Sequence, residues 1–107
     1  MVLSFSHAAM ARGYELRLNM STCEPDGIVS TWKERSDPRD FWVSQAVVLE
    51  IELEEMNLNS VEQECSGERT QSDRIRCMEY KRTIRQSAQR CLNVSRRRCR
   101  ENGACLP

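Results

Sequence analysis

Six cysteines are the residues of this 107-residue chain that most clearly predict chemistry: Cys23, Cys65, Cys77, Cys91, Cys99 and Cys105. A zinc site usually needs close pairs such as C-x2-C, because two thiolates on one turn must reach the same ion. Here 41, 11, 13, 7 and 5 residues separate successive cysteines. An even number of cysteines in a short chain instead suits disulfides, whose pairing the spacing alone does not decide. We predict that all six form disulfides and that no metal or other cofactor is bound.

The residues that commonly serve as nucleophile, base or acid form no catalytic pattern. Nucleophilic catalysis needs a base beside the nucleophile, and the single histidine, His7, has no surrounding motif. Four carboxylates crowd one stretch: Glu50, Glu52, Glu54 and Glu55. Crowded glutamates on a helix usually form a solvated face, and nothing selects one of them as a general acid. We therefore expect that the protein is not an enzyme.

Four arginines form a basic run near the end of the chain: Arg96, Arg97, Arg98 and Arg100. Such a run can neutralise phosphates, but 16 basic and 16 acidic residues balance overall, and the tail has no aromatic residue for base stacking. We expect no nucleic-acid partner and treat the run as a candidate protein-contact surface. In the simpler interpretation, three consecutive arginines on a helix point in three directions, so that one or two of them meet Glu50, Glu54 or Glu62 and the others are solvated.

Two Asn-X-Ser triplets, at Asn19 and Asn93, are candidate glycosylation sites and favour a secreted protein. The first eleven residues, MVLSFSHAAMA, end in an A-x-A pattern but lack the basic and long apolar regions of a full signal peptide. Residues 1–11 are read as a flexible start, a signal remnant or a coincidence. No run of about 18 apolar residues is present, so we expect no membrane insertion. The mitochondrial intermembrane space is a minor alternative, although the cysteine spacing differs from that of its twin-cysteine hairpin proteins.

Residues 12–37 are expected to be extended or irregular. Tyr14–Leu18 alternates apolar and polar side chains, which predicts a short strand, and Glu24–Gly27 carries turn-forming residues. At Asp37 and Pro38 the signals change, because an aspartate can cap a first helical turn and a proline is tolerated there.

The first helical segment is predicted over residues 38–65. Apolar side chains recur every three or four residues at Trp42, Ala46, Leu49, Leu53 and Met56. Residues 49–54 also alternate strictly, which would suit a strand, but the preceding proline and the many glutamates favour a helix for residues 43–56. We predict a kink or break near residue 59, after which Ser60 and Gln63 resemble a capping box.

The second helix is predicted over residues 70–99, with Thr70 or Ser72 as its cap. Its apolar stripe runs through Cys77, Lys81, Ile84, Ala88 and Cys91, reinforced by Tyr80 and Leu92. Residues 41–70 carry one basic and seven acidic side chains, and residues 71–107 carry ten basic and three acidic. Opposite charges favour an antiparallel pairing of the two helices. The fold class is thus mainly α: a single domain, 1–107, built as a small disulfide-stabilised helical hairpin or bundle with an extended N-terminal segment.

The expected function is that of a small secreted protein that binds an extracellular or cell-surface protein, such as a receptor or channel, as cytokines, pheromones and venom components do. Disulfides make the free molecule rigid, so that less freedom is lost on binding. One alternative is an extracellular structural or assembly protein that forms a homodimer through an unpaired cysteine or an exposed Trp32 or Trp42. A small lipid carrier is a weaker alternative, because the mean hydropathy of −0.64 is low for a chain that must build a cavity.

Overall fold

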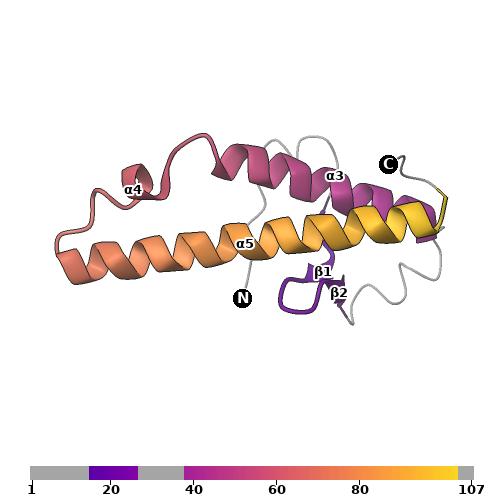
Figure 1. Cartoon of the computed structure of the whole chain (residues 1–107), viewed down its shortest axis with the longest axis horizontal. Coiled ribbons are helices and arrows are strands. Elements are labelled where there is room, and N and C mark those ends of the chain that lie inside the picture. Colours follow the sequence, from indigo (N-terminus) through magenta and orange to yellow (C-terminus); the bar gives the residue numbers. More distant parts are fainter. Residues whose placement is uncertain (1–14, 27–37, 104–107) are drawn as a thin grey trace.

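The computed structural model describes residues 15–26 and 38–103. The elements in these ranges are β1 (Leu18–Asn19), β2 (Glu24–Pro25), α3 (Pro38–Met56), α4 (Val61–Glu64) and α5 (Gln71–Glu101). Figure 1 shows α3 antiparallel to the C-terminal half of α5, while α4 lies beside its N-terminal half. The predicted fold class, a mainly helical hairpin with disulfides, is confirmed.

Helix α3 begins at Pro38, as predicted, and the helical interpretation of residues 43–56 is confirmed. Its buried apolar residues are Phe41, Trp42, Ala46, Val48, Leu49, Ile51 and Leu53. They cover a wider face than the predicted stripe because α3 is packed from two sides. Besides α5, the N-terminal segment contacts α3: the Gln45 carboxamide accepts from the Arg17 backbone N–H (2.8 Å) and donates to the Glu15 carbonyl (3.1 Å).

The predicted first segment is divided, because α3 ends at Met56 and α4 begins only at Val61. The helical segment predicted over residues 38–65 is therefore confirmed as two helices, and so is the break near residue 59. The capping box is present: Ser60 Oγ accepts from the Gln63 N–H (3.1 Å), and Gln63 Oε1 accepts from the Ser60 N–H (2.9 Å). These side chains satisfy backbone donors that the first helical turn leaves unpaired.

Helix α5 is slightly longer than predicted, from Gln71 to Glu101. Thr70 is its cap, since its Oγ1 accepts from the Asp73 N–H at 3.0 Å. Gly103 follows the helix with a positive φ of 76°, a backbone conformation that glycine adopts without strain. The expected core role of Tyr80 is wrong, because this side chain is 60% exposed.

The N-terminal segment forms a small hairpin whose strands and turn differ from those predicted. Leu18 pairs with Pro25 and Asn19 with Glu24, so residues 24 and 25 lie in a strand and not in the expected turn. Of the strand expected over residues 14–18, only the last residue, Leu18, lies in β1. Residues 14 and 27 lie outside the described ranges. The turn comes earlier, where Asn19 Oδ1 accepts from the backbone N–H groups of residues 21 and 22.

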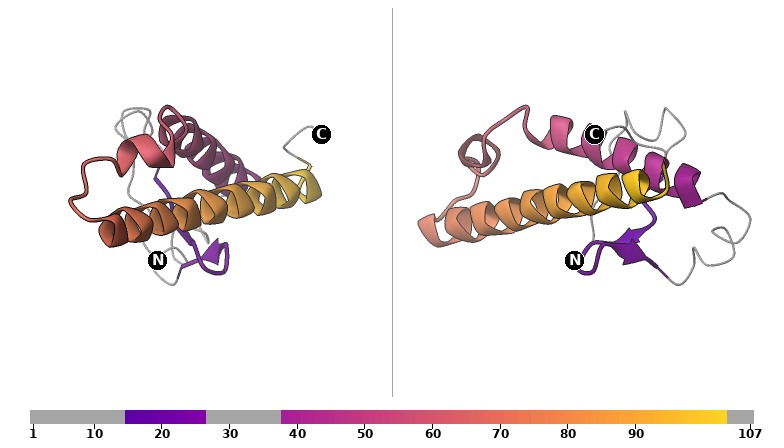
Figure 2. Two further views of the ribbon diagram at one scale, coloured as in Figure 1. Left: turned by 60° about the vertical axis from the view of Figure 1, so that its left-hand side comes forward. Right: turned by 45° about the vertical axis from the view of Figure 1, so that its right-hand side comes forward.

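Two disulfides connect these elements. Cys23–Cys91 joins the hairpin to α5 beside the helical core, and Cys65–Cys77 joins the residue after α4 to the second turn of α5. Figure 2 shows the two elements that these bonds attach to α5, the hairpin and α4, from two further directions. The bonds close loops with sequence separations of 68 and 12 residues. By loop-closure entropy such bonds stabilise a fold by about 4 and about 3 kcal/mol respectively. Cys99 is also disulfide-bonded. Its partner is neither Cys23 nor Cys65, because these two cysteines are bonded to Cys91 and Cys77. Cys105 lies outside the described residues.

Candidate interaction surface

The two halves of α5 differ in how deeply they are buried. All buried residues of this helix lie in its C-terminal half, against α3 and the hairpin: Ser87, Ala88, Cys91, Leu92, Ser95 and Cys99. The N-terminal half continues beyond the end of α3, and the element that contacts it there is the four-residue α4. We call residues 57–85 the distal arm (Figure 1). The arm comprises the α3–α4 connection, α4, the α4–α5 connection and the N-terminal half of α5.

The distal arm is held by covalent and ionic contacts, because α4 contributes no buried residue. Cys65 is bonded to Cys77 at the base of α4. The Glu64 carboxylate lies 3.1 Å from Lys81 Nζ and 3.1 Å from an Arg85 guanidinium nitrogen. Arg85 also donates to the carbonyl of residue 59, at 3.1 Å. The acidic segment and the basic helix thus attract each other here, as the charge distribution predicts.

Glu62 adds a further ion pair within the arm. Its carboxylate accepts a hydrogen bond from Arg82 at 2.9 Å. Its own backbone N–H, at the start of α4, lowers the pKa of this carboxyl below the usual range, and Arg82 and Arg85 lower the pKa further. The charged form of Glu62 is therefore the form that stabilises the folded arm.

Exposed apolar side chains concentrate on the distal arm. Among the described residues, four large hydrophobic side chains are exposed, and three of them belong to the arm: Leu58 (75%), Ile75 (44%) and Tyr80 (60%). The fourth is Val43 on α3, at 36%. Ile75 and Tyr80 are five residues apart on α5, which places them about 140° from each other, on two flanks of the helix.

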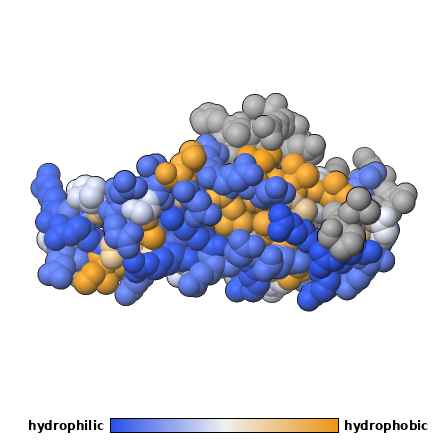
Figure 3. Space-filling view, turned by 45° about the horizontal axis from the view of Figure 1, so that its top comes forward, coloured by the Kyte–Doolittle hydropathy of each residue, from blue (hydrophilic) through white to orange (hydrophobic). Residues whose placement is uncertain are grey.

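A shallow groove continues the apolar surface from Ile75. It has a volume of about 460 Å³ and is lined by Glu62, Ser66, Gln71, Arg74, Ile75 and Met78. Figure 3 shows hydrophobic surface at the left-hand end of the molecule, over the start of α5, and further hydrophobic surface over α3. The arm therefore combines apolar side chains with charged ones around them.

The basic run does not form one continuous surface. Arg96 pairs with Glu50 (3.5 Å) and Arg97 with Glu101 (3.9 Å), while Arg98 pairs with Glu24 on the hairpin (2.9 Å). The expected pairing of one arginine with Glu50 is confirmed by Arg96. The expectation that the other arginines are merely solvated is wrong, because Arg97 and Arg98 also form ion pairs.

Arg100 belongs to the predicted basic contact surface, and Trp42 to the predicted dimer contact. Arg100 is exposed and makes no ion pair within residues 15–26 and 38–103. Trp42 is only 4% exposed, so the suggestion that it could bridge two subunits is wrong for the monomer described; Trp32 lies outside the described residues. The predicted burial of Trp42 against α5 is confirmed by its contact with Arg98.

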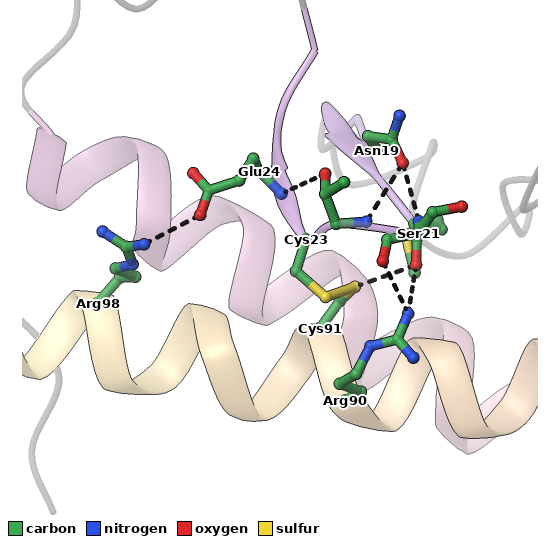
Figure 4. Close-up of a disulfide and its surroundings, with 9 residues drawn as sticks. Asn19, Ser21, Cys23, Glu24, Arg90, Cys91 and Arg98 are labelled. Carbon is green, nitrogen blue, oxygen red and sulfur yellow. Dashed lines mark hydrogen bonds and ion pairs between the residues drawn. A yellow bond between two sulfur atoms is a disulfide. The ribbon is translucent and has the colours of Figure 1, made fainter.

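Contacts around the Cys23–Cys91 disulfide fix the hairpin on α5 (Figure 4). Arg90 donates to the carbonyls of Met20 (2.8 Å) and of the next residue (3.3 Å). The Met20 carbonyl oxygen also lies 3.7 Å from Cys91 Sγ. Asn19 and Asn93, the two candidate glycosylation sites, lie on the hairpin and on α5 respectively, and both side chains are exposed.

No group of three or more histidine, cysteine, aspartate or glutamate side chains in the described part of the chain is placed to hold a metal ion. Within the crowded glutamates, Glu50, Glu54 and Glu55 are exposed and Glu52 is buried; His7 lies outside the described ranges. No helix in this part of the chain has the length and apolarity that would let it cross a membrane.

Comparisons with known proteins add no relative from which a role could be inferred. No family model, curated protein or solved structure matches the chain. The apolar residues of the distal arm are therefore interpreted from their own geometry. Sequence reasoning assigned Tyr80 to the core because it adjoins the helical stripe, but the break near residue 59 leaves α3 too short to cover that part of α5.

Proposed function

We propose that this protein is a small secreted molecule that binds an extracellular or cell-surface protein through its distal arm. The observation that carries the proposal is that the arm exposes Leu58, Ile75 and Tyr80 while a disulfide and ion pairs hold it in place. Contiguous exposed apolar patches rimmed by polar residues are typical of protein-contact surfaces. Tyrosine is moreover enriched among the residues that dominate binding energy.

The contacts that hold the distal arm support a role in binding, and not in folding, for the exposed side chains of Leu58, Ile75 and Tyr80. They are not needed to attach α4, because Cys65–Cys77 and the Glu64 ion pairs already do so. A pre-organised surface loses less side-chain and backbone freedom when a partner binds. The arm therefore has both properties that a small protein ligand needs, apolar contact area and rigidity.

Secretion is the second part of the proposal. Disulfides are typical of oxidising compartments, and small extracellular domains use them to supplement a thin core. The two Asn-X-Ser triplets are compatible with a glycoprotein, and a receptor or channel ligand of the signalling or toxin type is the functional class that we favour. Arg100, which makes no ion pair within the described residues, remains a candidate for a secondary contact at the other end of α5.

Binding of labelled protein to intact cells tests this function. The purified, disulfide-bonded chain would be labelled at its N-terminus and titrated onto cells cultured from the organism that produces it. We expect saturable binding that excess unlabelled protein displaces and that protease treatment of the cells abolishes. Purely linear, non-displaceable uptake would contradict the proposal, and binding that survives the protease would exclude a protein partner.

Self-association is the competing use of the same apolar side chains. Light scattering after size-exclusion chromatography distinguishes the two uses, because a protein ligand remains monomeric at the concentrations at which it binds cells. A stable dimer that loses its cell binding would favour the assembly protein, and lipid recovered by mass spectrometry from the purified protein would favour the carrier.

A further inference from the structure

The hydroxyl of Ser95 has no role in the fold described. Ser95 is fully buried, at 0% exposure, and its Oγ makes no hydrogen bond with any residue of the described chain. Burying a hydroxyl without a partner opposes folding, so an alanine would suit this core position better. Something other than packing must account for a serine here.

Ser95 is the third residue of the triplet Asn93-Val94-Ser95. We propose that Asn93 carries an N-linked glycan and that Ser95 is present because the glycosylating enzyme requires a hydroxyl two residues after the asparagine. The inference rests on the secreted location in the proposed function. The other triplet carries no such signal, because Ser21 is exposed and its hydroxyl is not confined to a dry site.

The geometry of Asn93 suits attachment of a sugar. The side chain is exposed on α5, and its Oδ1 accepts a hydrogen bond from Gln89 Nε2 at 3.0 Å. That bond orients the carboxamide and leaves Nδ2, the atom that receives the sugar, without a partner among the described residues. A glycan can therefore be joined to Asn93 without breaking any contact of the fold.

The surface around Asn93 can also accommodate the first sugar. An open groove of about 520 Å³ is lined by Gln86, Gln89, Arg90, Asn93, Val94 and Arg97. Amide and guanidinium groups can hydrogen-bond to sugar hydroxyls, and Val94 offers a small apolar area. Asn93 is also about 20 Å along α5 from Tyr80, by the helical rise, so a glycan there leaves the distal arm free.

The transfer must take place before the chain folds, because the folded helix buries the hydroxyl that the enzyme has to recognise. In the reaction, Nδ2 of Asn93 attacks the anomeric carbon of an oligosaccharide carried on a lipid pyrophosphate. The bond from that carbon to the pyrophosphate oxygen breaks, and lipid pyrophosphate leaves with the electron pair. Nδ2 loses one proton to a base of the transferase, which leaves an N-glycosidic bond.

The test is to direct the full chain into the secretory pathway of cultured eukaryotic cells with a cleavable leader, and to map glycans by mass spectrometry. We expect Asn93 to be glycosylated in the parent chain, to be unmodified in Ser95→Ala, and to regain the glycan in Ser95→Thr. A secreted, disulfide-bonded parent chain with an unmodified Asn93 would overturn the inference. Glycan occupancy does not depend on cell binding, so this failure is distinguishable from failure of the proposed function.

A second comparison separates the recognition role of Ser95 from a structural one. The variants Asn93→Gln and Asn93→Gln,Ser95→Ala both lack the glycan and differ only in the buried hydroxyl. We expect the double variant to melt at the same temperature or higher, because it removes an unpaired polar group. A clearly lower melting temperature would show that the hydroxyl supports the fold and would remove the reason for the proposal.

Discussion

Arg98 lies over the ring of Trp42, with its guanidinium carbon 5.8 Å from the ring centroid. The same guanidinium pairs with Glu24 of the hairpin at 2.9 Å, so one side chain connects α5, α3 and the N-terminal segment. Phe41 packs edge-on against Trp42, at a centroid distance of 5.0 Å. This corner of the core is therefore closed by an aromatic pair and a cation.

Replacing these residues should reveal an order of effects on stability. Trp42→Ala should lower the free energy of unfolding by about 3–5 kcal/mol, because it empties a buried site. Arg98→Gln should cost about 1 kcal/mol, since the cation–π contact and the ion pair are partly exposed. Arg97→Gln is the matched control, with an expected loss below about 0.5 kcal/mol. Urea unfolding measures all three, and equal losses for the two arginine variants would contradict the role assigned to Arg98.

The two described disulfides should differ in which part of the molecule they stabilise. In the double variant Cys65→Ser,Cys77→Ser, we expect faster amide hydrogen exchange in residues 57–85 with little change in the α3–α5 core, because α4 has no buried residue of its own. Cys23→Ser,Cys91→Ser should instead destabilise the whole fold, since that bond lies in the core and closes the longer loop. Unchanged exchange in the arm of the first variant would contradict this account.

Acidification should weaken the arm through Glu62. Because the folded-state pKa of this carboxyl is lowered, its contribution to stability is present above the unfolded-state pKa and is lost as pH falls through the folded-state value. NMR titration should give a midpoint below the usual glutamate range. Arg82→Gln should raise that midpoint only partly, because the backbone hydrogen bond, the largest cause, is retained. An unchanged midpoint in this variant would mean that the ion pair is not formed in solution.

All six cysteines should be oxidised in the native protein. Thiol titration of the unfolded but unreduced chain should find essentially no free thiol. Peptide mapping should recover Cys23–Cys91 and Cys65–Cys77 as separate cross-linked fragments. Several reactive thiols, or a different pairing of these four cysteines, would contradict the disulfide framework and with it the argument for an extracellular location.

Local signals in the sequence predicted much of the helical fold. Pro38, the Ser60–Gln63 box and Thr70 each act within a few residues of their own position, so their effects can be recognised without knowing the tertiary structure. Tyr80 was misplaced for the opposite reason, because its exposure depends on where another helix ends.

The hairpin and the basic run show the same limit. The turn before Cys23 depends on hydrogen bonds to the Asn19 side chain. In the sequence, Asn19 begins an Asn-X-Ser triplet, so the same residue indicates a glycosylation site and the turn is not recognised. The charge pattern predicted that one or two of these arginines meet Glu50, Glu54 or Glu62, and Arg96 does pair with Glu50. The partner of Arg98 is Glu24 on the hairpin, at a separation that no local pattern encodes. Among the candidate sites, the sequence therefore indicated the cysteines and asparagines but not the exposed apolar residues of the distal arm.

The most direct test of the distal arm as the contact surface is a comparison of cell binding between two variants. One carries Leu58→Ser, Ile75→Ser and Tyr80→Ser, and its control carries Val43→Ser, which changes the remaining exposed large hydrophobic residue among those described. Both should retain the parent's disulfides and circular dichroism, because all four side chains are exposed. We expect the arm variant to bind at least about tenfold more weakly, equivalent to about 1.4 kcal/mol, and the control to bind like the parent. Parent-like binding by a folded arm variant, or a loss confined to Val43→Ser, would contradict the proposed function.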